Sequence, residues 1–196
     1  MKFTSSIISV AFVAVGLVSA ASIPADIETS AHIDGEVETR GWRPPVCVKR
    51  SQATPWFRAY NAQSTDHFYT TNPGELGNAV RNLGYKPEGI AAYIFPRWQP
   101  STTPLFRMYN SDNQDHFYTA DLGERAHAIA NLDYRDEGVA GYVYSWAICG
   151  SVPLYRLYSG KGTDHFYTTS ASERDSARRS GYQVEGIVGF VFLSRF

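Results

Sequence analysis

Hydrophobic and polar residues alternate in short stretches that return along this chain at a fixed interval. Over residues 104–109, Phe106 and Met108 fall on one side and the intervening residues on the other, which is the pattern of a β-strand. A polar turn follows over residues 110–114, and residues 116–119 predict the returning strand of a hairpin. That strand belongs to a five-residue sequence, Asp-His-Phe-Tyr-Thr, which starts at residues 66, 115 and 164 and therefore recurs every 49 residues. This period predicts a repeat architecture.

Each repeat also predicts a helix and a final strand. The helix begins after a capping residue, and a glutamate three positions later completes a capping box; the pairs are Asn72 with Glu75, Asp121 with Glu124, and Ser170 with Glu173. It ends at a residue suited to a left-handed turn, namely Gly84, Asp133 or Gly181. The third helix carries several arginines and few apolar residues. We therefore expect it to be more exposed than the other two, or to face a partner.

These elements predict an α+β fold of three tandem strand-strand-helix-strand repeats, at about residues 55–98, 104–146 and 153–196. One repeat is too small to bury its apolar face alone, so the three copies are expected to share one core. We expect them to close into a ring with pseudo-threefold symmetry, because closure removes exposed sheet edges. A linear stack is the alternative.

The N-terminal residues differ from the repeats in composition. Residues 1–20 combine a basic start, an apolar run and a small-residue cleavage pattern, which predicts a signal peptide. Residues 21–41 hold five acidic residues against Arg40 alone and no aromatic residue, which is typical of a disordered tail or a propeptide. Residues 42–196 then form a single three-repeat domain. We expect a secreted, extracellular protein.

Charge and cysteine content narrow the range of partners. From residue 42 onward acidic and basic residues are nearly balanced, which offers neither a basic face for nucleic acid nor a polybasic anchor for a membrane. The two cysteines, Cys47 and Cys149, are expected to form a disulfide, because an isolated pair in a secreted chain most often does so. The oligomeric state does not follow from the sequence.

An arginine, a tyrosine and an aspartate recur together in every repeat and are the candidate ligand-binding residues. An aromatic face beside charged groups is what a sugar site uses, since the ring covers the sugar and the charged groups bind its hydroxyls. The alternative is an Arg–Asp or Arg–Glu bridge inside each repeat, stacked on tyrosine, because buried charges must be paired. The set comprises Arg58, Tyr60, Asp66, Arg107, Tyr109, Asp115, Arg156, Tyr158 and Asp164.

Histidine and glutamate also recur once per repeat, and we interpret them as structural. The histidines could converge as a metal site, but a residue present in every copy is first one that every copy needs to fold, so we predict no metal. The glutamates could pair with the aspartates as glycosidase carboxylates, yet three equivalent pairs are unusual for an enzyme. We predict a protein without catalytic residues or cofactor. The residues concerned are His67, His116, His165, Glu88, Glu137 and Glu185.

The pattern Leu-Tyr-Arg-Leu-Tyr, then Asp-His-Phe-Tyr-Thr, then Glu-Gly-Ile, resembles a family of tandem tyrosine-rich repeats of no established activity from secreted bacterial and fungal proteins. The resemblance covers about residues 55–196. Some bacterial members carry these repeats beside cell-wall hydrolase domains, so the resemblance implies a wall-binding or glycan-binding accessory role. Ala59 and Ala91 depart from the pattern, which implies an altered site in the first repeat.

We therefore predict a secreted, non-catalytic binding module whose ligand is a carbohydrate or cell-wall polymer. Three shallow equivalent sites would favour a polymer through avidity. The first alternative is an extracellular protein-binding or effector-like module that uses the arginine-rich third helix. The second is a glycan hydrolase that acts through the Glu and Asp sets. Trp56, Trp98 and Trp146 lie near repeat junctions and would be further stacking candidates if they are exposed.

Overall fold

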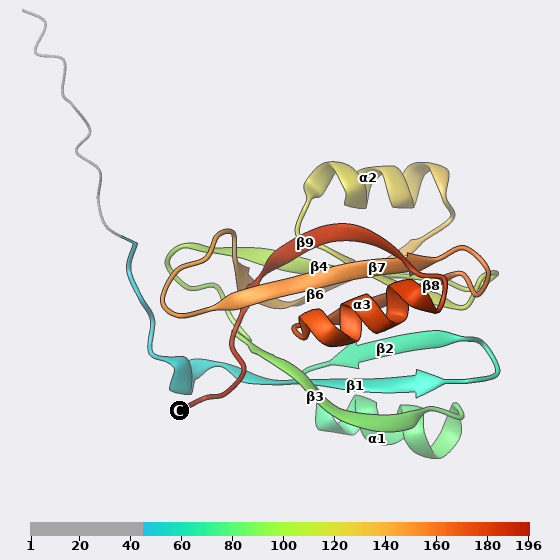
Figure 1. Ribbon diagram of the computed structural model, residues 1–196, viewed down its shortest axis with the longest axis horizontal. Helices are drawn as coiled ribbons and strands as arrows, with labels where there is room; N and C mark the ends of the chain where they lie inside the picture. The colour runs from blue at the N-terminus through green and yellow to red at the C-terminus, as the bar shows by residue number, and fades with distance from the viewer. Residues whose placement is uncertain (1–44) are drawn as a thin grey trace, which may run out of the picture. The chain divides into compact units, whose positions relative to one another are not determined.

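The computed structural model describes residues 45–196, and the predicted signal peptide and acidic tail lie outside this range. Nine strands and three α-helices occur in the described part of the chain, and Figure 1 shows the helices on the outside of the strands. The strands are β1 (Thr54–Asn61), β2 (Asp66–Thr70), β3 (Lys86–Ile94), β4 (Thr102–Asn110), β5 (Asp115–Thr119), β6 (Arg135–Tyr144), β7 (Val152–Ser159), β8 (Asp164–Thr168) and β9 (Gln183–Val191). The helices are α1 (Pro73–Asn82), α2 (Leu122–Asn131) and α3 (Ala171–Arg179), and a 3-10 turn covers Arg50–Gln52.

The strands form two antiparallel sheets of unequal size, and the prediction of an α+β repeat fold is wrong. One sheet has the order β2-β1-β3, and the other has the order β5-β4-β6-β9-β7-β8. The larger sheet spans two of the sequence repeats because β6 and β9 pair at Tyr144 and Phe190. The first repeat keeps its own sheet and reaches the other through isolated bridges at Tyr93 and Phe95. The described chain is therefore mostly β, with three short helices.

A glycine in the third strand of each repeat bends that strand across its partner. Gly89, Gly138 and Gly186 have φ values of 98°, 89° and 131°, which favour glycine. Each lies opposite the recurring arginine, and the pairing register shifts beside it, as in a β-bulge. The bulge places the preceding glutamate next to that arginine.

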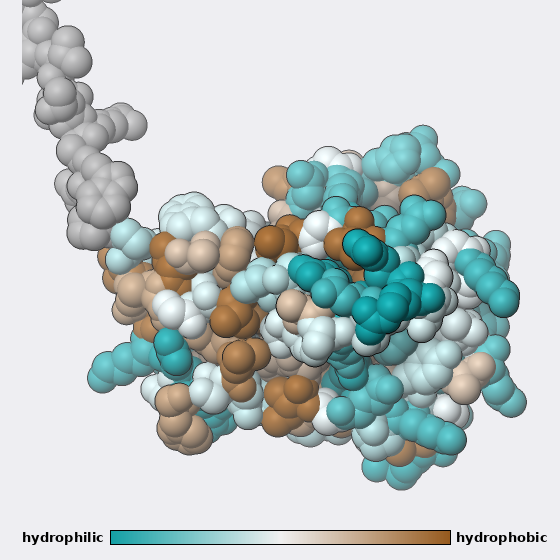
Figure 2. Space-filling view, viewed as in Figure 1, coloured by the Kyte–Doolittle hydropathy of each residue, from teal (hydrophilic) through white to brown (hydrophobic). Residues whose placement is uncertain are grey.

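The helices begin and end where the sequence predicts. The side chains of Asn72, Asp121 and Ser170 accept hydrogen bonds from the first-turn backbone. The residue after each C-cap has a positive φ. Helices α1 and α2 bury Ala79 and Ala128, whereas α3 buries no residue. Figure 2 shows hydrophilic residues gathered over α3, as its sequence predicts.

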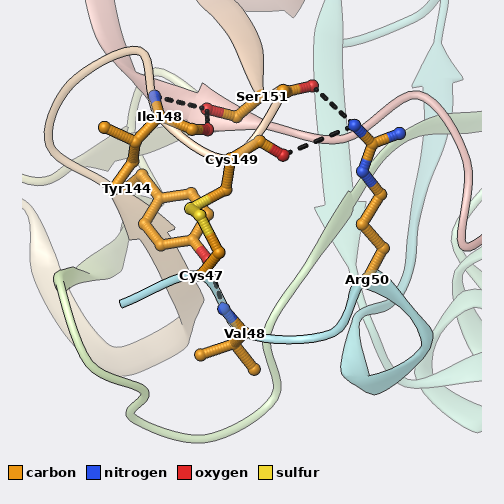
Figure 3. Close-up of a disulfide and its surroundings, with 8 residues drawn as sticks. Cys47, Val48, Arg50, Tyr144, Ile148, Cys149 and Ser151 are labelled. Carbon is orange, nitrogen blue, oxygen red and sulfur yellow. Dashed lines mark hydrogen bonds between the residues drawn. A yellow bond between two sulfur atoms is a disulfide. The ribbon is translucent and has the colours of Figure 1, made fainter. Parts of the chain in front are cut away.

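The disulfide between Cys47 and Cys149 is present, which confirms the prediction from the sequence. Figure 3 shows it beside Tyr144, whose hydroxyl accepts a hydrogen bond from the backbone N–H of Val48 at 3.4 Å. Arg50 donates to the Cys149 carbonyl, also at 3.4 Å. The bond therefore ties the segment before β1 to the segment between β6 and β7. Within residues 45–196, no helix has the length and apolar character needed to cross a membrane.

Candidate functional site

A closed ring of hydrogen bonds between three buried tyrosines fixes the centre of the domain. The Tyr118 hydroxyl accepts from the Tyr69 backbone N–H at 2.9 Å and donates to the Tyr69 carbonyl at 2.6 Å. Tyr167 makes the same two bonds to Tyr118, both at 2.8 Å. Tyr69 closes the ring onto Tyr167, at 2.8 and 2.9 Å. Burial raises the pKa of all three hydroxyls, so they remain neutral donors.

The three aspartates are fully buried and join the segments to one another. The Asp66 carboxylate accepts from the His116 backbone N–H at 2.9 Å and from His116 Nδ1 at 2.7 Å. It also accepts from the Tyr85 hydroxyl. Each histidine therefore binds an aspartate of another segment, not the one adjacent to it in sequence. The same contacts join Asp115 to His165 and Tyr134, and Asp164 to His67 and Tyr182.

The three carboxylates also approach one another, with oxygen atoms that all lie within 4.8 Å. Oxygen ligands of this kind bind Ca²⁺ or Mg²⁺ in other proteins. Each carboxylate here already accepts three hydrogen bonds from its histidine and tyrosine partners. Sequence reasoning considered the histidines as metal ligands and missed this convergence, although the equal register of Asp66, Asp115 and Asp164 was its signal. The predicted absence of a metal stays a prediction.

Each recurring arginine binds two glutamates. Arg107 donates to both carboxylate oxygens of Glu75 at 3.1 and 2.8 Å, and its Nε lies 2.8 Å from Glu137. Its guanidinium also lies over the ring of Phe68, 5.4 Å from the centroid. The equivalent groups are Arg58 with Glu173 and Glu88, and Arg156 with Glu124 and Glu185.

These pairs only partly match the bridge that the sequence suggested as an alternative to a sugar site. One glutamate of each pair belongs to the arginine's own repeat, as in that alternative. The second comes from the helix of a different repeat, and the stacking partner is a phenylalanine. The arginines therefore hold neighbouring segments together while their edges stay partly accessible: the Arg107 side chain is 16% exposed.

The arginines keep the helix glutamates ionised. Hydrogen bonds from Arg156 outweigh the opposing effect of burial and lower the pKa of Glu124 to about 2. Burial acts to raise the pKa of Glu75, but the hydrogen bonds from Arg107 and Thr70 exceed this effect and lower it. The pKa of Glu173 is lowered for the same reasons. A carboxyl group in this state cannot serve as a general acid near neutral pH.

Several grooves open beside these ion pairs, and two of them are also lined by a recurring tyrosine and histidine. The first groove, of about 410 Å³, is lined by Arg107, Tyr109, His116, Glu75, Glu137 and Asn61. The second groove, of about 610 Å³, is lined by Arg156, Tyr158, His165, Glu124, Glu185 and Asn110. In both, the tyrosine ring packs against the histidine, with centroids 4.5 and 4.7 Å apart. Each groove therefore presents an aromatic ring beside charged and amide groups.

The structure places only some of the predicted ligand-binding residues at the grooves. Four of them line the grooves, whereas the three aspartates lie fully buried and line neither one. Arg58 and Tyr60 make the same contacts as their equivalents, with Glu88 at 2.8 Å and the His67 ring at 4.5 Å, but they line neither groove.

Sequence reasoning missed the tyrosines that follow the helices. Tyr85 and Tyr134 line the first and second grooves and donate to the buried aspartates. Their recurrence one residue after the helix-ending Gly84 and Asp133 was a signal that could have found them.

The tryptophans near the repeat junctions differ in exposure. Trp56 is fully buried and stacks on Tyr69, with ring centroids 4.5 Å apart. Trp98 and Trp146 are 63% and 52% exposed. Both follow residues that pack beside the disulfide, away from the two grooves. Their exposure meets the condition under which the sequence made them stacking candidates.

Comparison with known proteins gives one match. The family model of a domain of unknown function, DUF5648, matches residues 55–192. Neither a curated protein nor a solved structure matches the chain. The matched range contains β1 to β9 and both grooves.

Proposed function

This chain belongs to the DUF5648 family, and we propose that it is a non-catalytic module that binds carbohydrate in its two grooves. The observation that supports this proposal is the recurrence of one arrangement: a half-buried tyrosine ring beside an arginine–glutamate pair and an asparagine. Sugars present an apolar face and a rim of hydroxyls, and this arrangement complements both.

Two shallow sites on one domain suit a polymer better than a single small molecule. A polysaccharide can occupy both grooves, so the second contact forms at a high effective concentration. The disulfide between Cys47 and Cys149 is of the kind found in oxidising compartments. We therefore include in the proposal a secreted protein that acts on an extracellular or cell-wall glycan.

The charge state of Glu75 and Glu124 argues against either of them as the proton donor of a hydrolase. Glycoside cleavage by paired carboxyl groups requires one carboxyl that holds its proton near neutral pH. The pKa values of Glu75 and Glu124 are instead lowered, and both carboxylates are tied to arginines. We expect no soluble products when the protein is incubated with chitin, glucan, mannan or peptidoglycan and the supernatant is analysed by chromatography.

Retention of the protein on these insoluble polymers tests the proposal. Replacing Tyr109 or Tyr158 with alanine should weaken binding by at least about fivefold, as expected for an aromatic anchor in a binding site. The Tyr109→Phe variant keeps the ring and should retain most of the binding. Thermal melting of each variant shows whether the fold is intact.

A matched control distinguishes the grooves from the other exposed aromatic surface. Trp98→Ala lies outside both grooves and should bind like the parent. If Trp98→Ala loses retention while Tyr109→Ala and Tyr158→Ala keep it, the site is at the disulfide end. If the parent binds none of the polymers, the glycan proposal is wrong and the exposed α3 becomes the better candidate, as a protein-binding surface.

A further inference from the structure

The two grooves have the same plan but differ in net charge. Among its lining residues the first groove balances two carboxylates, Glu75 and Glu137, with two guanidinium groups, Arg107 and Arg135. The second groove is lined by four carboxylates and a single guanidinium. These are Asp112, Glu124, Asp133 and Glu185, with Arg156.

Two exposed aspartates contribute most of this difference in charge, and the rest comes from Arg135, which lines only the first groove. Asp112 lies in the turn between β4 and β5, and Asp133 follows α2. Asn110 joins the two segments, because its side chain accepts from the Asp112 backbone N–H at 2.9 Å and donates to the Leu132 carbonyl at 2.8 Å. Within residues 45–196 neither takes part in an ion pair, whereas Glu124 and Glu185 are both bound to Arg156. Two carboxylates are therefore available to a ligand in this groove.

The corresponding positions of the first repeat carry no charge. Gln63 stands where Asp112 stands, and Gly84 where Asp133 stands, each 49 residues earlier. Gly84 and Asp133 share a left-handed backbone, with φ values of 77° and 56°. At this position the grooves differ by a substitution on a shared backbone conformation.

We propose that the second groove selects cationic amino sugars, such as glucosamine units whose amine is not acetylated. This rests on the proposed function, because Tyr158 would carry the sugar ring while Asp112 and Asp133 receive the ammonium group. Charge-assisted hydrogen bonds between an ammonium and a carboxylate are stronger than neutral ones. An N-acetylated sugar has no such charge and gains nothing from the two aspartates.

Other ionisable groups face the same ligand and bear on the choice of conditions. His127 and His165 line the groove and oppose a cation when they are protonated. Lys161 is on the turn that carries Thr163 but does not line the groove. The amino group of a glucosamine unit carries its charge only below about neutral pH, so binding is compared at several pH values and the preference for the amine form is measured at the mildly acidic end.

The test is calorimetric titration of the full chain with a glucosamine oligosaccharide and with its fully N-acetylated counterpart. The parent should bind the amine form more tightly, and raising the salt from about 0.05 to about 0.5 M should reduce the difference. Asp112→Gln and Asp133→Gly, which copy the first repeat, should each weaken the amine form by about fivefold. Both should leave binding of the acetylated form within about twofold of the parent.

Asp175→Asn removes one carboxylate on α3, outside the groove, and should bind the two oligosaccharides as the parent does. The inference is overturned if the parent does not prefer the amine form, or if the aspartate variants keep that preference. Glycan binding that still depends on Tyr158 would then leave the proposed function intact. Loss of all sugar binding would overturn both. Calcium binding by the parent that Asp112→Gln abolishes, without any sugar preference, would assign the aspartates to a cation instead.

Discussion

The closed ring of hydrogen bonds between Tyr69, Tyr118 and Tyr167 predicts that Tyr118→Phe destabilises the domain. The substitution keeps the aromatic ring, which is T-shaped against Tyr69 at a centroid distance of 5.6 Å. It removes the hydroxyl that accepts from the Tyr69 N–H at 2.9 Å and donates to the Tyr69 carbonyl at 2.6 Å. Both backbone groups belong to a residue with no exposed surface, so water cannot replace the lost partner.

The magnitude follows from these two groups. An unsatisfied buried donor or acceptor costs about 1–3 kcal/mol, so two of them should lower the free energy of unfolding by about 3 kcal/mol or more. Urea unfolding measures this change, and tryptophan fluorescence is a suitable signal because Trp56 stacks on Tyr69. We expect the midpoint to fall and the m-value to stay unchanged.

Tyr60→Phe is the matched control. Its hydroxyl makes no hydrogen bond within the described part of the chain, and the side chain is half-buried, so its stability should change by less than about 0.5 kcal/mol. If Tyr118→Phe also changes the free energy of unfolding by less than about 0.5 kcal/mol, the reasoning is refuted, because the hydrogen bonds of the Tyr118 hydroxyl would then contribute nothing measurable.

Three other predictions concern ion pairs and the disulfide. Arg107→Ala should lower the unfolding free energy by about 3 kcal/mol, because two partly buried carboxylates lose their partner; urea unfolding measures it. The pKa of Glu124 is lowered from 4.5 to about 2, so its stabilisation is complete above pH 4.5 and is lost as the pH falls toward 2. In the Glu124→Gln variant the free energy of unfolding should therefore depend less on pH between about pH 4.5 and about pH 2. The Cys47–Cys149 disulfide closes a loop with a sequence separation of 102, so its reduction should lower the free energy of unfolding by up to about 4.7 kcal/mol. Thermal melting with and without reductant measures this loss.

Each of these has a result that would contradict it. If Arg107→Ala melts like the parent but no longer binds glycan, the arginine serves the ligand and not the fold. An unchanged acid slope in Glu124→Gln would mean that another group controls acid unfolding. Two free thiols in freshly purified protein, detected by intact mass, would contradict the disulfide.

The local elements of this domain could be predicted from the sequence because their signals are local. The cap at Asn72, the left-handed residue Gly84 and the alternation within β4 depend on residues a few positions apart. Because the sequence repeats every 49 residues, the elements read in one repeat also predict those of the other two repeats.

The arrangement of the strands could not be predicted in the same way. Three similar segments could share their edges in several ways, and the choice depends on the pairing of β6 with β9 through Tyr144 and Phe190. No local pattern in either strand specifies that partner. The expectation of equal repeats in an α+β fold failed for this reason.

The candidate site shows the same limit. The sequence indicated that each arginine needs an acidic partner, and Glu137 beside Arg107 was within reach of that argument. The second partner, Glu75, lies on a helix of the preceding repeat and is brought near only by the packing of the segments. The grooves form at these junctions, so their lining residues could not be assembled from one repeat.

The most direct test of glycan binding in the grooves is a nuclear magnetic resonance titration of the isotope-labelled protein with a soluble oligosaccharide of the retained polymer. We predict that the backbone signals that shift most belong to the groove linings, with Tyr109 and His116 in the first groove and Tyr158 and His165 in the second. Shifts confined to the segments around Trp98 and Trp146, or no shift at saturating sugar, would contradict the account.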